Sequence, residues 1–284
     1  MNFQQLSDTD LEAQFNLRAT VPGAERFLAE YSDRSIIVRE RLGGRLNVAY
    51  GDTPRQILDV FPAQGMNSPV HIFIHGGYWR ALDKNAHSFI AEPMVAAGVT
   101  TVVLNYELCP FVGIGEIVEQ IRNAIAWVFR NAARFGGDPE RLFLSGHSAG
   151  AHLAMMALKH DWEGAGLPAR IIKGVVGISG VYELTPLIRT SLNQELHLTQ
   201  DVAVRNSPTL FPPDAIAPVL IAVGESESNG FFKQSADFYA ACRRNKVDCQ
   251  FMQLEETNHF NIIFGMADPA SPLHRAALQQ MSIA

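Results

Sequence analysis

The middle and C-terminal parts of the chain alternate between short apolar runs and segments whose apolar residues recur at helical spacing. The runs are nearly continuous in Val, Ile, Leu and Phe, which is typical of parallel strands buried on both faces. They fall at residues 70–74, 100–104, 142–144, 171–178, 219–223 and 249–254. A crossover helix is expected over 115–135. This alternation predicts an α/β fold with a mostly parallel, doubly wound sheet.

The first 61 residues follow a different pattern. Residues 8–32 carry apolar side chains at helical spacing and are interrupted at Pro22-Gly23, so we expect helix there. Three runs separated by glycine-containing turns follow, at residues 35–42, 46–50 and 56–61. They predict strands that pair antiparallel at the start of the sheet.

Between residues 182 and 218 the strand rhythm stops. The stretch is polar and contains several prolines, and it is too long for a plain connection. Insertions of this kind commonly cover an active site. We therefore expect a single α/β domain over residues 1–284, with an inserted cap at about 182–218.

A serine stands where the run 142–144 gives way to a helical pattern, in the sequence Gly146-His147-Ser148-Ala149-Gly150. In a G-x-S-x-G turn, glycines two residues either side of the serine remove collisions around a strained backbone. The N–H of Ala149, at the start of the following helix, faces negative charge that develops on the substrate. The motif predicts Ser148 as the nucleophile of a serine hydrolase.

A nucleophilic serine needs a histidine as base and a carboxylate to orient it, and in sheets of this type both follow later strands in the order serine, acid, histidine. His259 comes directly after the run 249–254, and no other histidine after Ser148 stands at a strand end. We expect it to be the general base. Glu225 and Glu227 both follow the run 219–223. Glu227 lies farther past the strand and has more freedom to reach His259, so it is the expected acid, with Glu225 as the alternative.

The run 70–74 continues into His75-Gly76-Gly77-Tyr78-Trp79. Paired glycines allow backbone N–H groups to approach a substrate oxygen closely. We expect this loop, with Gly76 and Gly77, to supply oxyanion donors beside that of Ala149, and His75 to brace the loop. The alternative is a tight turn with no catalytic role.

Composition narrows the class of partner. The net charge is −6 and the basic residues are scattered, so no phosphate-binding surface and no nucleic acid partner is expected. The N-terminus lacks a secretion signal and no apolar run is long enough to span a membrane, which predicts a soluble, cytoplasmic protein without membrane contact.

No metal or cofactor is expected either. Cys109, Cys242 and Cys249 lack the spacing of a disulfide framework or a zinc site. His147 and His152 are five residues apart, off the i, i+4 spacing that places two ligands on one helix face. A chelator should therefore leave activity unchanged.

Four segments together resemble the kynurenine formamidase (arylformamidase) family of α/β hydrolases: residues 75–79, residues 146–153, Arg205-Asn206-Ser207-Pro208 and Asn258-His259-Phe260. The resemblance runs from about residue 70 to the C-terminal region. It implies an α/β-hydrolase fold and an H-G-G-x-W oxyanion loop in which Gly76, Gly77 and Tyr78 act together with Ala149. It also implies a triad that cleaves N-formyl-L-kynurenine to kynurenine and formate in tryptophan catabolism. The family's acid is an aspartate, whereas the matching position here is Glu227.

We therefore expect a hydrolase of aryl formamides with a small-molecule substrate and, by the habit of such families, a homodimer. Candidates for an apolar slot around the aromatic ring are Trp79, Tyr182, Phe231, Phe232 and Phe260, the alternative for each being ordinary core packing. The alternatives are a carboxylesterase for short-chain aryl esters and a hydrolase of another amide in aromatic or N-heterocycle degradation. A binding protein without turnover is disfavoured because both the serine and the histidine are present.

Overall fold

The structure is a computed structural model that describes residues 1–214 and 217–283. In this part of the chain an eight-stranded sheet has the order β1-β2-β4-β3-β5-β6-β7-β8. The pairs β1/β2 and β2/β4 are antiparallel, and all other neighbours are parallel. The strands are β1 (Arg45–Ala49), β2 (Ile57–Phe61), β3 (Ser68–Ile74), β4 (Thr100–Leu104), β5 (Gly137–His147), β6 (Ile172–Ile178), β7 (Val219–Gly224) and β8 (Cys249–Leu254).

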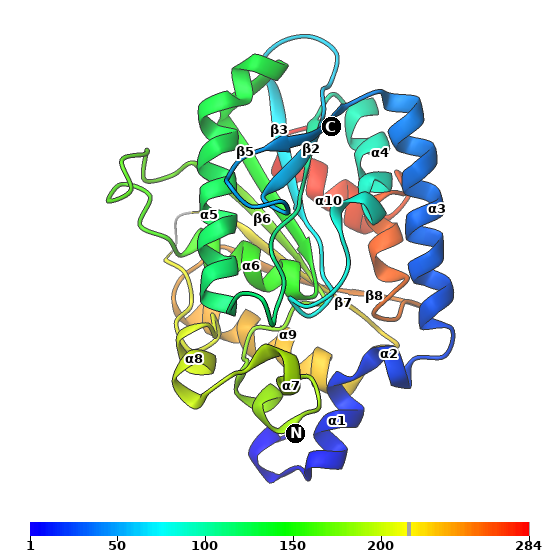
Figure 1. The fold of residues 1–284 in the computed structure, drawn as a ribbon, viewed down its shortest axis with the longest axis vertical. Coiled ribbons are helices and arrows are strands. Elements are labelled where there is room, and N and C mark those ends of the chain that lie inside the picture. The colour runs from blue at the N-terminus through cyan, green and yellow to red at the C-terminus, as the bar shows by residue number, and fades with distance from the viewer. Residues whose placement is uncertain (215–216, 284) are drawn as a thin grey trace.

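Helices cover both faces of this sheet (Figure 1). One face packs against α3 (Ala24–Leu42), α4 (Ala91–Ala96) and α10 (Pro272–Gln280). The other packs against α5 (Ile114–Asn131), α6 (Ala149–Leu158) and α9 (Asn229–Arg244). The remaining elements are shorter: α1 (Asp8–Phe15), α2 (Leu17–Thr20), α7 (Asn193–Leu196), α8 (Gln200–Arg205) and the 3₁₀ turns η1 (Phe3–Gln5), η2 (Lys84–Ala86), η3 (Ser88–Ile90), η4 (Ala132–Phe135), η5 (Thr185–Arg189) and η6 (Ile262–Met266).

Consecutive residues of the central strands enter two separate cores. Ile72 packs toward α5 and α6, while its neighbour Phe73 packs toward α3 and α4. Val102 and Val103 divide in the same way. Side chains alternate between the faces of a strand, so a sheet covered on both sides needs apolar residues at every position. The predicted doubly wound, mostly parallel sheet is confirmed.

One predicted strand is wrong. Residues 35–42 form the second half of α3 rather than a strand. Tyr31, Ser35 and Val38 are buried at helical spacing, whereas Ile36 and Ile37 are more than half exposed. The β-branched residues suggested a strand, but packing of the helix face against the sheet overrides this weak preference.

Residues 182–218 contain η5, α7 and α8. Residues 215–216, inside the predicted cap, lie outside the described part of the chain. Of the helices the structure describes, none combines the length and apolar character needed to cross a membrane.

The parallel strands end at a common edge of the sheet. The loops that follow β3, β5, β7 and β8 therefore meet there. Figure 1 shows α1, α2 and α7 gathered at this end, so the N-terminal helices and part of the 182–218 segment lie over the strand ends.

Candidate active site

Ser148 occupies the turn between β5 and α6. Its backbone has φ 57° and ψ −118°, a conformation that non-glycine residues rarely adopt. The neighbouring glycines are sterically required: a Cβ on Gly146 would lie 2.2 Å from the Gly150 carbonyl oxygen, and one on Gly150 would lie 2.0 Å from that of Ile74. The turn therefore holds a strained serine because both flanking positions lack a side chain.

The structure brings Ser148, His259 and Glu227 together from three different strand ends. The His259 Nε2 atom is 3.1 Å from Ser148 Oγ, and its Nδ1 is 2.8 Å from Glu227 Oε2. An ionised carboxylate only accepts hydrogen bonds, so Nδ1 carries the proton and Nε2 offers its lone pair to the serine hydroxyl. This chain of bonds prepares Ser148 Oγ to lose its proton to His259.

Glu227 is fixed by more than the histidine. Its other carboxylate oxygen, Oε1, accepts hydrogen bonds from Ser179 Oγ and from the Gly224 N–H, the latter at 2.9 Å. Its side chain is fully buried. Glu225, the alternative acid, is exposed and accepts a bond from the Glu256 N–H at 3.2 Å. The geometry thus favours Glu227.

Ser179 was missed by the sequence analysis. It directly follows β6, so its place at a strand end is the signal that could have found it. A serine at a strand end is common, however, and nothing in the sequence pairs it with Glu227.

The loop after β3 passes directly against the serine turn. A Cβ on Gly76 would lie 3.1 Å from the Cβ of Ser148. Gly77, Tyr78 and Trp79 have successive positive φ values of 104°, 51° and 56°. Within residues 1–214 and 217–283, no acceptor is found for the backbone N–H of Gly77, Tyr78 or Ala149. Unused donors beside the nucleophile are what an oxyanion hole requires.

Hydrogen bonds from the segment after β4 hold the β3 loop in place. The Tyr106 hydroxyl donates to the His75 carbonyl at 2.8 Å, and the Cys109 N–H donates to the Trp79 carbonyl at 2.8 Å. The ring of His75 stacks on Tyr106, with centroids 4.3 Å apart. His75 thus occupies the bracing position expected of it.

Two further histidines of the serine motif have structural partners. Burial lowers the pKa of His147 well below its usual value, with the nearby His259 adding to the effect. The neutral His147 donates from Nε2 to the backbone carbonyl of His259 at 2.8 Å, which helps fix the position of the base. Burial also lowers the pKa of His152 to about 4. His152 accepts a bond from Trp79 Nε1 and donates to the Asn206 carbonyl, so it belongs to the packing of the site.

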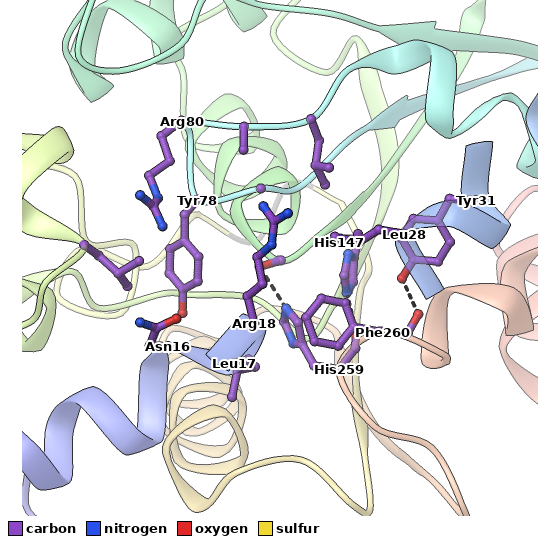
Figure 2. Close-up of a pocket in the computed structure, with 15 residues that line it drawn as sticks. Asn16, Leu17, Arg18, Leu28, Tyr31, Tyr78, Arg80, His147, His259 and Phe260 are labelled. Atoms are coloured by element: carbon purple, nitrogen blue, oxygen red, sulfur yellow. Dashed lines mark hydrogen bonds between the residues drawn. The ribbon is translucent and has the colours of Figure 1, made fainter. Parts of the chain in front are cut away.

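A pocket with about 640 Å³ of empty space, including its open mouth, leads to Ser148 and His259 (Figure 2). Phe260 lies on its wall. The other expected wall residues do not: Trp79, Tyr182 and Phe231 are fully buried in the core, and Phe232 is exposed against Phe251. Trp79, Tyr182 and Phe231 thus take the alternative role of core packing, because aromatic residues near a site serve equally as its supporting core.

About a third of the wall comes from the N-terminal segment, residues 1–42, where the sequence predicted no site residue. It contributes Asn16, Leu17, Arg18, Leu28 and Tyr31. From the predicted cap, Leu192 is the one described residue that reaches the wall. No motif marks the N-terminal residues, and they do not follow strands, so the sequence offered no signal for them.

Hydrogen bonds tie this segment to the three loops of the site. The Tyr78 hydroxyl, on the β3 loop, donates to the Phe15 carbonyl at 2.6 Å. Ser228, next to the acid, donates to the Gln14 carbonyl at 2.7 Å. Tyr31 donates to the Phe260 carbonyl beside the base. Each loop therefore has at least one hydrogen bond to the N-terminal helices.

No group of three or more His, Cys, Asp or Glu side chains suited to a metal ion is present in the described part of the chain.

Comparison with known proteins places this geometry in a family. The sequence matches the BD-FAE family over residues 58–242. The kynurenine formamidase of Salmo salar is 35% identical over 244 residues, which are 83% of this chain and 81% of the relative. That of Danio rerio is 35% identical over 230 residues, 78% of this chain and 77% of the relative.

A crystal structure from Silicibacter sp. TM1040, described as a "putative thioesterase", superposes with a TM-score of 0.82 at 32% identity, covering 96% of this chain and 98% of that one. The resemblance predicted from the four sequence segments is confirmed, and with it the α/β-hydrolase fold. The chain belongs to the kynurenine formamidase family of α/β hydrolases.

Proposed function

We propose that this protein is a serine hydrolase of aryl formamides that converts N-formyl-L-kynurenine to L-kynurenine and formate. The observation that carries the proposal is the hydrogen-bonded chain from Ser148 through His259 to Glu227 at the base of a pocket, in a member of this family. Ser148 is the proposed nucleophile, His259 the base and Glu227 the acid.

The proposed reaction has two halves. His259 Nε2 takes the proton of Ser148 Oγ as that oxygen attacks the formyl carbon. The N–H groups of Gly76, Gly77, Tyr78 and Ala149 stabilise the oxyanion of the tetrahedral intermediate. The imidazolium then gives its proton to the departing arylamine nitrogen as the C–N bond breaks.

The second half releases formate. Water gives a proton to His259 and attacks the formyl ester on Ser148, and collapse of the second intermediate returns the proton to Ser148 Oγ. Glu227 stays ionised throughout and stabilises the imidazolium in each half. An arylamine leaves more readily than an alkylamine, which suits an esterase-like site to this amide bond.

Two segments are proposed to cover the site. The N-terminal helices supply one side of the wall, and the segment at about 182–218 adds Leu192 as part of a single α/β domain. The apolar surfaces of Leu17, Leu28 and Phe260 fit the aromatic ring of the substrate.

The test compares Ser148→Ala with the wild-type enzyme on N-formyl-L-kynurenine and on p-nitrophenyl acetate. We expect kcat/KM to fall at least about 10⁴-fold on both substrates, because the nucleophile is lost. Ser226→Ala, in an exposed loop position, is the matched control and should retain activity. Full hydrolysis by Ser148→Ala would overturn the mechanism. Wild-type turnover of the ester but not of the formamide would instead favour a carboxylesterase.

A further inference from the structure

Two arginines, Arg18 and Arg80, lie on the pocket wall of a protein whose net charge is −6. Among the described lining residues there is no Asp or Glu. A guanidinium whose charge is not fully balanced by a neighbouring carboxylate favours an anionic group of a ligand there.

The charge of Arg80 is already balanced. Its guanidinium pairs with Glu195, whose side chain belongs to α7. Burial raises the pKa of Glu12 on α1, but its bonds from Ser191 and Asn16 outweigh this and lower it, with a smaller contribution from Arg80. Glu195 thus balances most of the charge of Arg80, and little of it remains for a ligand.

Arg18 has one carboxylate partner. Its Nε and Nη2 atoms donate to the two oxygens of Glu25, the Nη2 bond being 3.0 Å long. The pair occupies the side edge of the guanidinium. In the described part of the chain, the third nitrogen, Nη1, has no hydrogen-bond partner, and the side chain is 58% exposed. The edge of the guanidinium that carries Nη1 is therefore open to a second carboxylate.

The position of Arg18 suits this role. It lies on α2, and its guanidinium is seen between Tyr78 and His147 in Figure 2, on the wall that surrounds Ser148 and His259. The Glu25 bond raises the pKa of Arg18, so its charge is permanent. Glu25 also restricts the guanidinium, which reduces the entropy lost when a ligand binds.

We propose that Arg18 is a specificity-determining residue that binds the carboxylate of the substrate, so that the enzyme selects aryl formamides whose side chain carries a carboxylate. The inference rests on the proposed function. In N-formyl-L-kynurenine the carboxylate is separated from the ring by three carbons of a ketone side chain ortho to the formamide. With the formyl group at Ser148, that side chain extends toward the mouth of the pocket, where Arg18 stands.

The experiment uses two substrates that differ in this side chain. N-formyl-L-kynurenine carries the amino acid group, whereas 2′-formamidoacetophenone keeps the formamide and the aryl ketone but has no charge. The measured quantity is the ratio of their kcat/KM values. For Arg18→Gln we expect this ratio to fall about tenfold or more, mainly through a higher KM for N-formyl-L-kynurenine, because a charge-assisted fork is lost.

Two further variants sharpen the result. Arg18→Lys keeps the charge but not the fork, and should lose only about threefold in the ratio. Arg26→Gln removes an exposed arginine that does not line the pocket, and should keep the wild-type ratio. Added salt should raise the wild-type KM for N-formyl-L-kynurenine more than that of Arg18→Gln.

An unchanged ratio in Arg18→Gln would overturn the inference while leaving the proposed function intact. An equal loss on both substrates would also overturn it, since Arg18 would then act on the shape of the site and not on the carboxylate. If the wild-type enzyme hydrolyses neither formamide, the proposed function fails and the inference fails with it.

Discussion

The loops at the strand ends and the N-terminal segment both shape the pocket, but in different ways. The loops place Ser148, His259 and Glu227 through backbone geometry that tolerates little change. The N-terminal segment is joined to the loops after β3, β7 and β8, mainly by side-chain hydroxyls that donate to backbone carbonyl oxygens. The proposed catalytic residues thus come from the strand-end loops, whereas part of the pocket wall comes from the N-terminal segment.

Close backbone packing distinguishes the strand-end loops. A Cβ on Gly224, at the end of β7, would lie 2.4 Å from the Thr257 carbonyl oxygen. The loop that carries Glu227 and the loop that carries His259 are therefore in contact. The loop that carries Glu227 is fixed against the loop that carries His259. From this position the glutamate, which is longer than the family's aspartate, reaches the histidine. The N-terminal contacts are ordinary hydrogen bonds, each contributing about 1 kcal/mol.

The largest effect in this comparison is expected for Glu227→Gln. A glutamine amide cannot stabilise the imidazolium and can favour the wrong tautomer of His259, so kcat/KM for an aryl formamide should fall about 10³- to 10⁴-fold. Steady-state kinetics at pH 7 would measure this, with circular dichroism to confirm the fold.

Glu225→Gln is the control for the same loop, because that carboxylate is exposed and contacts only a backbone N–H. We expect its activity to stay within about twofold of wild type. A larger loss in Glu225→Gln than in Glu227→Gln would show that the acid has been misassigned.

The sequence predicted the central sheet because strands buried on both faces must be apolar throughout, as in Phe73 and Val103. It also predicted that Ser148 and His259 are neighbours. Parallel strands end at one edge of the sheet, and the chain order serine, acid, histidine selects His259 as the base. The predicted strand at residues 35–42 is wrong. These residues belong to helix α3, whose buried face includes Tyr31, Ser35 and Val38.

The pocket wall could not be predicted in the same way. Trp79 belongs to the motif of the β3 loop, and Tyr182 lies in the loop after β6. Both side chains are nevertheless fully buried in the core behind the pocket. Arg18 and Leu28 reach the wall through the path of the N-terminal helices across the sheet edge, and this path is set by tertiary packing. Local sequence patterns report which face of an element is buried, but not which distant element covers it.

An intermediate effect is expected when the N-terminal anchors are removed. Tyr31→Phe and Tyr78→Phe each delete one hydroxyl that bonds a backbone carbonyl, and leave the rings in place. We expect kcat/KM to fall about 3- to 10-fold in each, mainly through kcat, because the loops that carry the base and the oxyanion donors gain freedom.

Tyr239→Phe is the matched control, since that ring lies on α9 and packs against Phe251 of β8, away from the pocket wall. Its kinetics should equal wild type. If Tyr31→Phe and Tyr78→Phe also behave as wild type, the N-terminal segment forms a wall without positioning the loops.

The smallest effect is expected at the far end of the same segment. Arg189 of η5 donates to Asp8 Oδ1 at 2.8 Å from Nε and to the Leu6 carbonyl at 2.8 Å from Nη2, but both charged side chains are largely exposed. Exposed ion pairs contribute little, because solvent screens them and ordering the side chains costs entropy. Arg189→Gln should therefore lower the unfolding midpoint by less than about 2 °C and change kcat/KM by less than about twofold. A loss as large as that of Tyr78→Phe would mean that the helices act as one rigid lid, in which the attachment to residues 182–218 matters as much as the bonds beside Ser148.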